Sequence, residues 1–401
     1  MSMKMRGGPL AGVRVVELTK VWAGPYTGKQ LAFLGAEVMR VESLGSLDVT
    51  RFYGVDDINK APGFRAVNPQ KMSVQIDSKT ERGVELLIDL IKAADIFIEN
   101  LRPGAVDRMG IGYEQIKAIN PNIIYVSMGM YGAEGPLAYQ TGYAPCFAAL
   151  SGLSAMVGYE GEAPTGMNIR YADSTFGTAA AFAASVALLH RRRTGQGQFI
   201  DVSAVEAMTS MIGDTVMDYT LNQRVGVCDG NKHPGMAPHG VYPCRDDEWV
   251  SIAVASDEKW QAFVAATGLT ALANNAELAT LAGRKAQEEA LNSAIADWSQ
   301  SQSAEEIVGC LMAAGIGVHK SLSSLDLIAD ANLWGRGFYQ EVEDAEGNAR
   351  SILGPAWKMT RPAAVVDDAP ALGQHNQYVL GEILGLSEAE QAQLVADGVI
   401  R

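Results

Sequence analysis

The run Val13-Arg14-Val15-Val16-Glu17-Leu18 is followed, after a loop and a helix at residues 26–34, by Glu37-Val38-Met39-Arg40-Val41-Glu42. Both apolar runs predict short buried strands. Strand, helix and strand of this length predict a βαβ unit, whose crossover is right-handed and whose loops at the carboxyl ends of the strands usually host the ligand. The first loop, at residues 19–25, has neither the G-x-G-x-x-G pattern of dinucleotide-binding folds nor a P-loop.

The pattern of alternating elements continues along the chain. Further strands are predicted at residues 72–76, 96–99 and 123–127, with a helix at 80–94. Strands that alternate with helices indicate a mostly parallel sheet. The fold class is therefore predicted as α/β, with a large doubly wound, Rossmann-like domain.

Composition limits the classes of function. The chain has 401 residues, 48% hydrophobic content and a formal net charge of −14, which predict two domains and argue against nucleic-acid or membrane partners. The four cysteines form no C-x-x-C pair, so neither a disulfide framework nor a zinc site is predicted. The chain start carries no apolar signal segment, and charged residues bound the most apolar helix, so we expect no membrane span and a cytoplasmic location.

One carboxylate precedes that apolar helix, in Arg170-Tyr171-Ala172-Asp173-Ser174-Thr175-Phe176-Gly177. Taken alone, the segment favours Asp173 as a helix N-cap, because aspartate oxygens accept the unpaired N–H groups of a first turn. The alternative is a nucleophilic carboxylate that these donors keep ionised at pH 7, beside a glycine that lets a ligand approach the backbone. Both roles are compatible in one residue.

The turn at residues 99–110 follows a predicted strand and carries Arg102 and Arg108. Planar guanidinium groups suit phosphate oxygens, so the turn is a candidate site for a phosphorylated cofactor. A solvated connecting loop is the alternative.

Eight segments together resemble the family III CoA-transferases, the group that includes formyl-CoA:oxalate and carnitine CoA-transferases and the related α-methylacyl-CoA racemases. They occur in the family's order along nearly the whole chain: residues 9–18, 23–25, 34–42, 99–112, 131–136, Asp173 with Gly177, 194–198 and 372–376.

The resemblance implies an architecture. Both chain ends, residues 1–218 and 338–401, would form the large CoA-binding domain, and residues 241–320 a smaller inserted α+β domain. Linkers are expected at 219–240, which is rich in Gly and Pro, and at 321–337. Two subunits of such proteins thread through each other as interlocked rings.

The resemblance also implies a mechanism. Asp173 would attack an acyl-CoA thioester to give a mixed anhydride, and the CoA thiolate would return to form an aspartyl-CoA thioester. An acceptor carboxylate would then take over the CoA. Coenzyme A is here a substrate rather than a tightly bound cofactor, and no metal is needed. Backbone N–H groups near residues 174–177 are candidate oxyanion donors.

The family pattern assigns site residues as well. CoA would contact Val21, Trp22 and Ala23 near the thioester, and Asn100, Leu101, Arg102 and Arg108 at the nucleotide end, with Lys71 as a further candidate. The alternative for each basic residue is an ordinary surface charge or ion pair.

The acceptor acid is less constrained by the sequence. We predict an apolar pocket, with Arg170 holding a second carboxylate; ordinary core packing is the alternative. Its candidate residues are Trp22, Tyr26, Met128, Met130, Tyr131, Tyr143, Phe147, Met167 and Tyr171. The resulting hypothesis is transfer from succinyl-CoA to a substituted succinate of the benzylsuccinate kind.

Two other hypotheses remain. An α-methylacyl-CoA racemase would have a histidine where Tyr143 stands, so transfer is favoured over racemisation. The chain could also be a non-catalytic subunit, because a homodimer and a heteromer with a related chain would use the same surfaces. The presence of Asp173 in the matching frame argues against a non-catalytic role.

Overall fold

The computed structural model describes residues 6–166 and 170–401. The chain divides into two compact units. Unit 1 runs through Ala155 and continues with Gly166–Gly226 and Asn332–Arg401, whereas unit 2 comprises Met156–Thr165 and Val227–Ala331. Unit 1 is thus built from both ends of the chain.

Unit 1 contains a six-stranded sheet in the order β3-β2-β1-β4-β5-β6, and all neighbouring strands are parallel. The strands are β1 (Arg14–Leu18), β2 (Glu37–Glu42), β3 (Met72–Gln75), β4 (Ile96–Glu99), β5 (Ile124–Gly129) and β6 (Gln198–Ser203). The prediction of an α/β fold with a mostly parallel sheet is confirmed. The sixth strand, β6, was missing from that prediction because its residues alternate only weakly in polarity.

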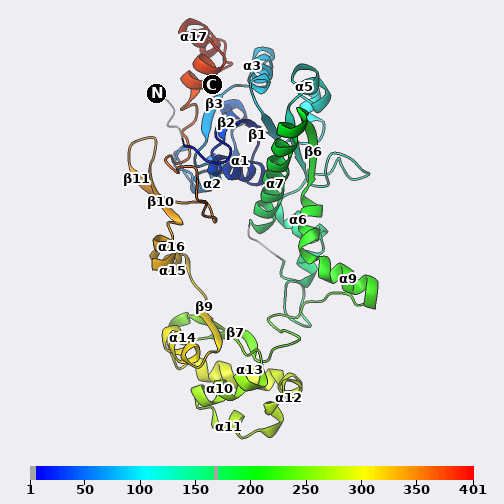
Figure 1. The fold of residues 1–401 in the computed structure, drawn as a ribbon, viewed down its shortest axis with the longest axis vertical. Helices are drawn as coiled ribbons and strands as arrows, with labels where there is room; N and C mark the ends of the chain where they lie inside the picture. Colours follow the sequence, from blue (N-terminus) through cyan, green and yellow to red (C-terminus); the bar gives the residue numbers. More distant parts are fainter. Residues whose placement is uncertain (1–5, 167–169) are drawn as a thin grey trace. The chain divides into compact units, whose positions relative to one another are not determined.

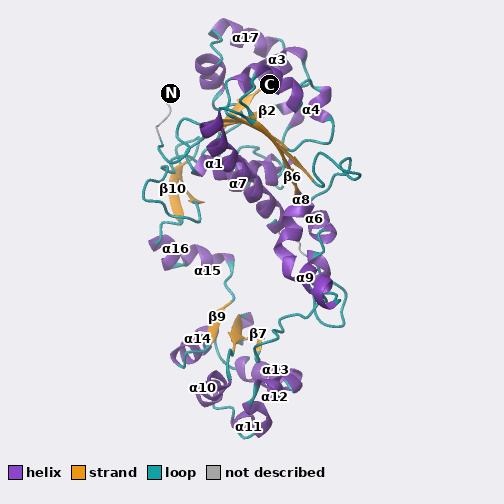
Figure 2. Ribbon diagram, turned by 45° about the vertical axis from the view of Figure 1, so that its right-hand side comes forward, coloured by secondary structure: helices purple, strands orange, loops and turns teal. Residues whose placement is uncertain are grey.

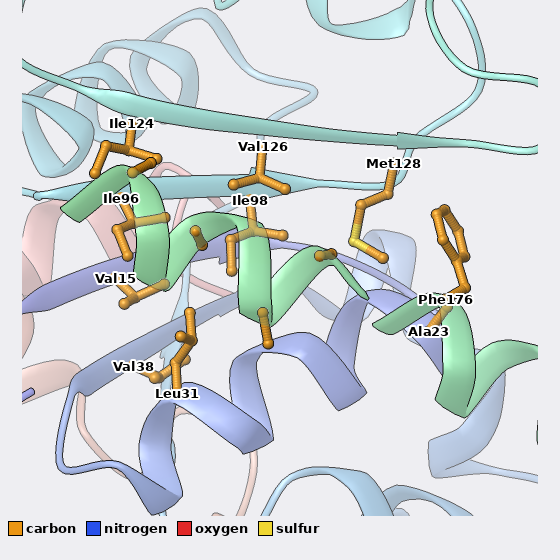
Figure 3. Close-up of a cluster of buried hydrophobic side chains, with 14 of the residues drawn as sticks. Val15, Ala23, Leu31, Val38, Ile96, Ile98, Ile124, Val126, Met128 and Phe176 are labelled. Atoms are coloured by element: carbon orange, nitrogen blue, oxygen red, sulfur yellow. The ribbon is translucent and has the colours of Figure 1, made fainter. Parts of the chain in front are cut away.

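Helices cover both faces of the sheet (Figure 1). Successive side chains of a strand point to opposite faces, so Val15 packs on the face covered by α1 (Ala23–Phe33) and α7 (Tyr171–Thr194), whereas Val16 packs with α3 (Glu81–Lys92). Figure 3 shows strand side chains such as Ile98 and Val126 directed toward α1 and α7. The doubly wound architecture follows from this two-sided burial.

Helix α7 packs closely against α1. A Cβ at Gly177 would lie 2.7 Å from the carbonyl oxygen of Ala23, so only glycine permits this approach. The helix is long enough to span a membrane, and its most apolar window has a mean hydropathy of 1.3. The charged residues on either side of it had led us to expect no such segment. Burial inside the protein covers 44% of its most apolar window, so packing in unit 1 accounts for part of this composition.

Unit 1 contains further elements besides this sheet and its covering helices (Figure 2). They are α2 (Pro62–Val67), α4 (Ala105–Arg108), α5 (Tyr113–Ile119), α6 (Ala144–Leu150), α8 (Ala204–Thr209), α9 (Gly213–Asn222), the antiparallel pair β10 (Tyr339–Glu343) and β11 (Ala349–Leu353), a π-helix (Gln377–Ile383) and α17 (Glu388–Ala396).

Unit 2 has its own core around Trp260 and Phe263. An antiparallel sheet, β7 (His239–Pro243), β8 (Trp249–Ala253) and β9 (Gly317–Lys320), packs with the helices α10 (Asp257–Thr267), α11 (Thr270–Ala273), α12 (Leu281–Ala286), α13 (Glu288–Ser299) and α14 (Ala304–Ala313).

The segments expected to be linkers contain regular structure. Residues 219–222 complete α9, β7 begins at His239, and the return segment carries α15 (Ser324–Ala329) and α16 (Ala331–Gly335). Ser323 caps α15 through a capping box with Asp326. Glycine and proline in these segments therefore do not exclude regular structure.

Candidate active site

The strand order reverses direction between β1 and β4, since β2 and β3 lie on one side and β5 and β6 on the other. Ligands of such folds bind at this switch point, outside the carboxyl ends of the strands. Leu18 pairs with Glu99 at those ends, so the two following loops begin side by side. Asn100 joins them: its Oδ1 accepts from Lys20 N at 2.7 Å, and its Nδ2 donates to Lys20 O at 2.9 Å.

A cavity of about 520 Å³ opens at this switch point. Five parts of unit 1 form its walls: the loop after β1, the segment after β2, the loop after β4, the end of β5 with the segment that leads into α6, and the first turns of α7. The lining includes Lys20, Val21, Trp22, Ala23, Val49, Asn100, Leu101, Arg102, Pro103, Met128, Gly129, Met130, Gln140, Thr141, Gly142, Tyr143, Cys146, Phe147, Asp173 and Phe176.

Asp173 is the only carboxylate among these described lining residues. It is the third residue of α7, whereas Arg170 holds the N-cap position, so the prediction that Asp173 is the N-cap is wrong. The helix begins three residues earlier than an N-cap at Asp173 would require. Ser174 N already donates to Arg170 O at 3.1 Å within the helix, so this N–H is not the free oxyanion donor that the sequence suggested.

Burial raises the pKa of Asp173 to about 6, and the nearby charge of Arg170 opposes part of this rise. The direction is the reverse of our expectation, in which cap donors stabilise the anion. The described residues supply no hydrogen bond to this carboxylate. A carboxylate of pKa about 6 is still about nine-tenths ionised at pH 7, and it is more basic than an exposed aspartate.

Trp22 connects the first loop to the start of α7. The Arg170 guanidinium lies over the indole ring, 4.5 Å from its centroid, and Trp22 Nε1 donates to Ser174 Oγ at 3.3 Å. A stacked guanidinium keeps its charge and its outward donors. Arg170 therefore contacts a residue that lines the Asp173 cavity but does not line the cavity itself, contrary to the prediction.

Ten of the predicted contacts line the cavity together with Asp173: Val21, Trp22, Ala23, Asn100, Leu101, Arg102, Met128, Met130, Tyr143 and Phe147. Tyr26 does not line it. The ring of Tyr26 packs beside Gly177 and under the Lys29 ammonium, which lies 5.5 Å from its centroid.

Lys71 also lies outside the cavity, contrary to its proposed contact with CoA. Its ammonium is fully buried and donates to Glu17 Oε1 at 2.7 Å, Pro25 O at 2.7 Å and Asn68 Oδ1 at 3.0 Å. These three bonds use all of its donors. Lys71 therefore holds the start of α1 against β1 and has no donor left for a ligand.

Arg108 lines an adjoining groove rather than the cavity itself. The groove has a volume of about 740 Å³ and shares Lys20 and Leu101 with the cavity. Three basic side chains, Lys20, Lys79 and Arg108, line the groove together with the carboxylates of Glu81 and Glu85.

Several lining residues were not predicted from the sequence: Lys20, Val49, Pro103, Gly129, Gln140, Thr141, Gly142, Cys146 and Phe176. Gly129 could have been found from its position at the end of β5, because every carboxyl end of a parallel strand faces this edge. Of the other predicted pocket residues, Tyr131 and Tyr171 do not line the cavity, and Met167 lies outside the described residues.

Comparison with known proteins agrees with this geometry. Residues 10–376 match the family described as CoA-transferase family III. The chain is 30% identical to a succinyl-CoA–D-citramalate CoA-transferase of Chloroflexus aurantiacus, over 100% of both chains, and 30% identical to a succinyl-CoA:glutarate CoA-transferase of Mus musculus, over 98% of this chain and 90% of the relative.

A solved structure has the same fold. The CAIB/BAIF family protein from Brucella suis superimposes with a TM-score of 0.88 at 30% identity, covering 94% of this chain and 100% of the other. Fold, cavity and sequence therefore lead to one conclusion: the chain is an enzyme of CoA-transferase family III.

Proposed function

We propose that this enzyme moves CoA from succinyl-CoA to a small dicarboxylic acid, with Asp173 as the nucleophile. The observation that carries the proposal is the position of Asp173, a half-buried carboxylate on the wall of the cavity at the switch point. The two relatives described above are named for succinyl-CoA as the donor.

The first half-reaction loads the enzyme. A carboxylate oxygen of Asp173 attacks the thioester carbonyl, the C–S bond breaks, and the CoA thiolate leaves behind a succinyl–aspartyl anhydride. The thiolate then attacks the aspartyl carbonyl carbon and expels succinate, which leaves an aspartyl-CoA thioester.

The second half-reaction repeats these steps in reverse. The acceptor carboxylate attacks the aspartyl thioester and releases the thiolate, which attacks the acceptor carbonyl of the new anhydride. Acceptor-CoA forms and Asp173 returns as a carboxylate. No net proton is transferred, so Asp173 must only be ionised, and its pKa of about 6 satisfies this at neutral pH.

The cavity and its adjoining groove fit the two ends of CoA. The loop at Val21–Ala23 would flank the thioester, while Asn100, Leu101 and Arg102 would carry the chain toward the groove. Lys20, Lys79 and Arg108 line that groove, and their charges would hold the phosphates.

Arg170 and the apolar lining favour a dicarboxylate acceptor. One carboxylate must reach Asp173, and the guanidinium above Trp22 can bind the other. Met130 and Tyr143 offer apolar surface between them. Citramalate and glutarate, which the relatives' names specify, are the first acceptors to test, and benzylsuccinate tests for a larger substituent.

The racemase alternative would need a base opposite Asp173 to exchange an α-proton. No histidine occurs among the described residues that line the cavity. The geometry therefore supports transfer rather than racemisation.

For assembly, we propose a dimer of interlocked subunits, either two copies of this chain or this chain with a close relative. On α7, the exposed residues Phe182, Val186 and Leu189 recur at helical spacing and form an apolar stripe. Such a stripe on a helix surface suits a partner subunit. Light scattering of the purified chain would give the mass, and a monomer at micromolar concentration would contradict the homodimer.

The decisive test traps the intermediate. The protein is incubated with succinyl-CoA and then with hydroxylamine, which converts an acyl-aspartate to a hydroxamate that peptide mass spectrometry can locate. We expect modification at Asp173 and none in Asp173→Asn. A modified residue elsewhere, or turnover by Asp173→Asn, would remove Asp173 from the mechanism.

A further inference from the structure

Val21 has an unusual backbone conformation. Its φ is +68°, in the left-handed region that β-branched residues rarely adopt. Strained residues of this kind persist only when surrounding contacts hold them, and they cluster at functional sites. Val21 lines the cavity and directly precedes Trp22, the N-cap residue of α1.

Asp48 supplies the contact that holds this residue. Val21 N donates to Asp48 Oδ2 at 3.0 Å, while Thr50 donates to the other oxygen, Oδ1, through its N and its Oγ1, both at 2.9 Å. The Asp48 side chain is only 2% exposed, and the equally buried Arg40 forms an ion pair with it. Asp48 is therefore a fixed acceptor aimed at the Val21 N–H group.

Arg40 fixes Asp48 in turn. Its guanidinium also contacts Glu17 Oε1 at 3.2 Å and Thr19 Oγ1 at 3.1 Å. The loop after β1 is thus tied to the buried charges of the sheet on one side and to Asn100 on the other. Between these anchors the chain must turn sharply at Val21.

We propose that Asp48 is a positioning residue that holds Val21 in its left-handed conformation and so sets Trp22 against the thioester site. It contacts no substrate, since it does not line the cavity. The inference rests on the proposed CoA-transferase function, and it assigns a role to a residue outside the reacting groups.

The main test is Asp48→Asn, which keeps the shape but removes the charge that pairs with Arg40 and sets an NH2 group against the donors on one side, either Val21 and Arg40 or Thr50. We expect kcat to fall at least tenfold while KM for succinyl-CoA changes less than threefold. Glycine adopts a positive φ without strain, so in a Val21→Gly background the same change should cost less than threefold. An equal loss in both backgrounds would overturn the proposal.

Two further variants separate positioning from folding. Thr50→Val removes one bond to Asp48 Oδ1 and leaves the Val21 bond intact, so kcat should stay within twofold of wild type. Val21→Pro removes the N–H group and cannot adopt a positive φ, without altering the buried Asp48–Arg40 pair. Its kcat should also fall at least tenfold, and this can be measured even if Asp48→Asn does not fold. A wild-type kcat in Val21→Pro would refute the proposal.

A crystal structure of Asp48→Asn, or of Val21→Pro should Asp48→Asn not fold, gives a readout that is independent of activity. We expect φ of residue 21 to become negative and the Trp22 ring to leave Ser174. If the wild type transfers no CoA to any acceptor, the proposed function fails while this structural result still decides the role of Asp48. A Val21 that keeps its positive φ in Asp48→Asn, or a Trp22 ring that stays on Ser174 in Val21→Pro, would disprove that role.

Discussion

Replacing Asp173 with asparagine should abolish CoA transfer and, at the same time, stabilise the protein at alkaline pH. Burial raises the pKa of Asp173 from 3.8 to about 6. The folded state therefore holds the proton more tightly than the unfolded state does. This favourable contribution is complete below pH 3.8 and is lost as the pH rises through 6.

The magnitude follows from the pKa difference. A rise from 3.8 to about 6 corresponds to about 3 kcal/mol of free energy of unfolding once the carboxylate is ionised in both states. Because the side chain is half-buried, solvent screens part of this penalty. We expect Asp173→Asn to be more stable than the wild type by about 1 to 3 kcal/mol at pH 8.

Urea unfolding of both proteins between pH 4 and pH 8 measures this difference. It should be near zero at pH 4 and rise to a plateau above pH 6. Asp77→Asn is a control for which the change in stability should have the opposite sign. Burial raises the pKa of Asp77, but the Lys79 N–H group and Arg401 lower it by more, so its pKa lies below the usual value. That variant should be less stable than the wild type at pH 8. An Asp173→Asn protein that is no more stable than the wild type at pH 8 would refute the reasoning.

Three further predictions concern the neighbourhood of the site. Arg170→Gln removes a charge that lowers the pKa of Asp173, so the acid limb of the kcat/KM profile should move above pH 6; an unchanged or lower limb would contradict the assignment. Gly28→Ala places a Cβ 1.9 Å from Glu17 Oε2, and calorimetry should show a loss of about 1 to 3 kcal/mol although alanine ordinarily favours a helix. Lys71→Met breaks the buried pair with Glu17 and should cost about 3 kcal/mol of stability, with KM for succinyl-CoA unchanged; a selective rise in KM would return Lys71 to the binding site.

The framework of the fold could be predicted because it depends on local patterns. The strands β1, β2 and β4 are short apolar runs between loops, and their predicted bounds agree with the structure to within one residue. The strand β6 was missed because its residues are only partly buried and their polarity pattern is weak. The helical segments beside the unit boundaries were missed because glycine and proline nearby suggested loops.

The site was predictable where chain position alone determines it. Residues directly after β1 and β4, such as Trp22 and Asn100, line the cavity because parallel strands end at the same edge. Lys71 stands just before a strand and was also predicted to contact CoA. Its ammonium instead forms a buried ion pair with Glu17. Sequence cannot distinguish these outcomes, since the partner lies 54 residues away along the chain.

The sequence by itself determined the βαβ framework, the family resemblance and the choice of Asp173, because hydrophobic periodicity and ordered motifs are properties of the chain alone. Only the tertiary structure decided the state of that carboxylate. Its surroundings raise its pKa, although a helix start alone would lower it. The strained Val21 and its acceptor Asp48 also became visible only in the fold, because 27 residues separate them and burial brings them together.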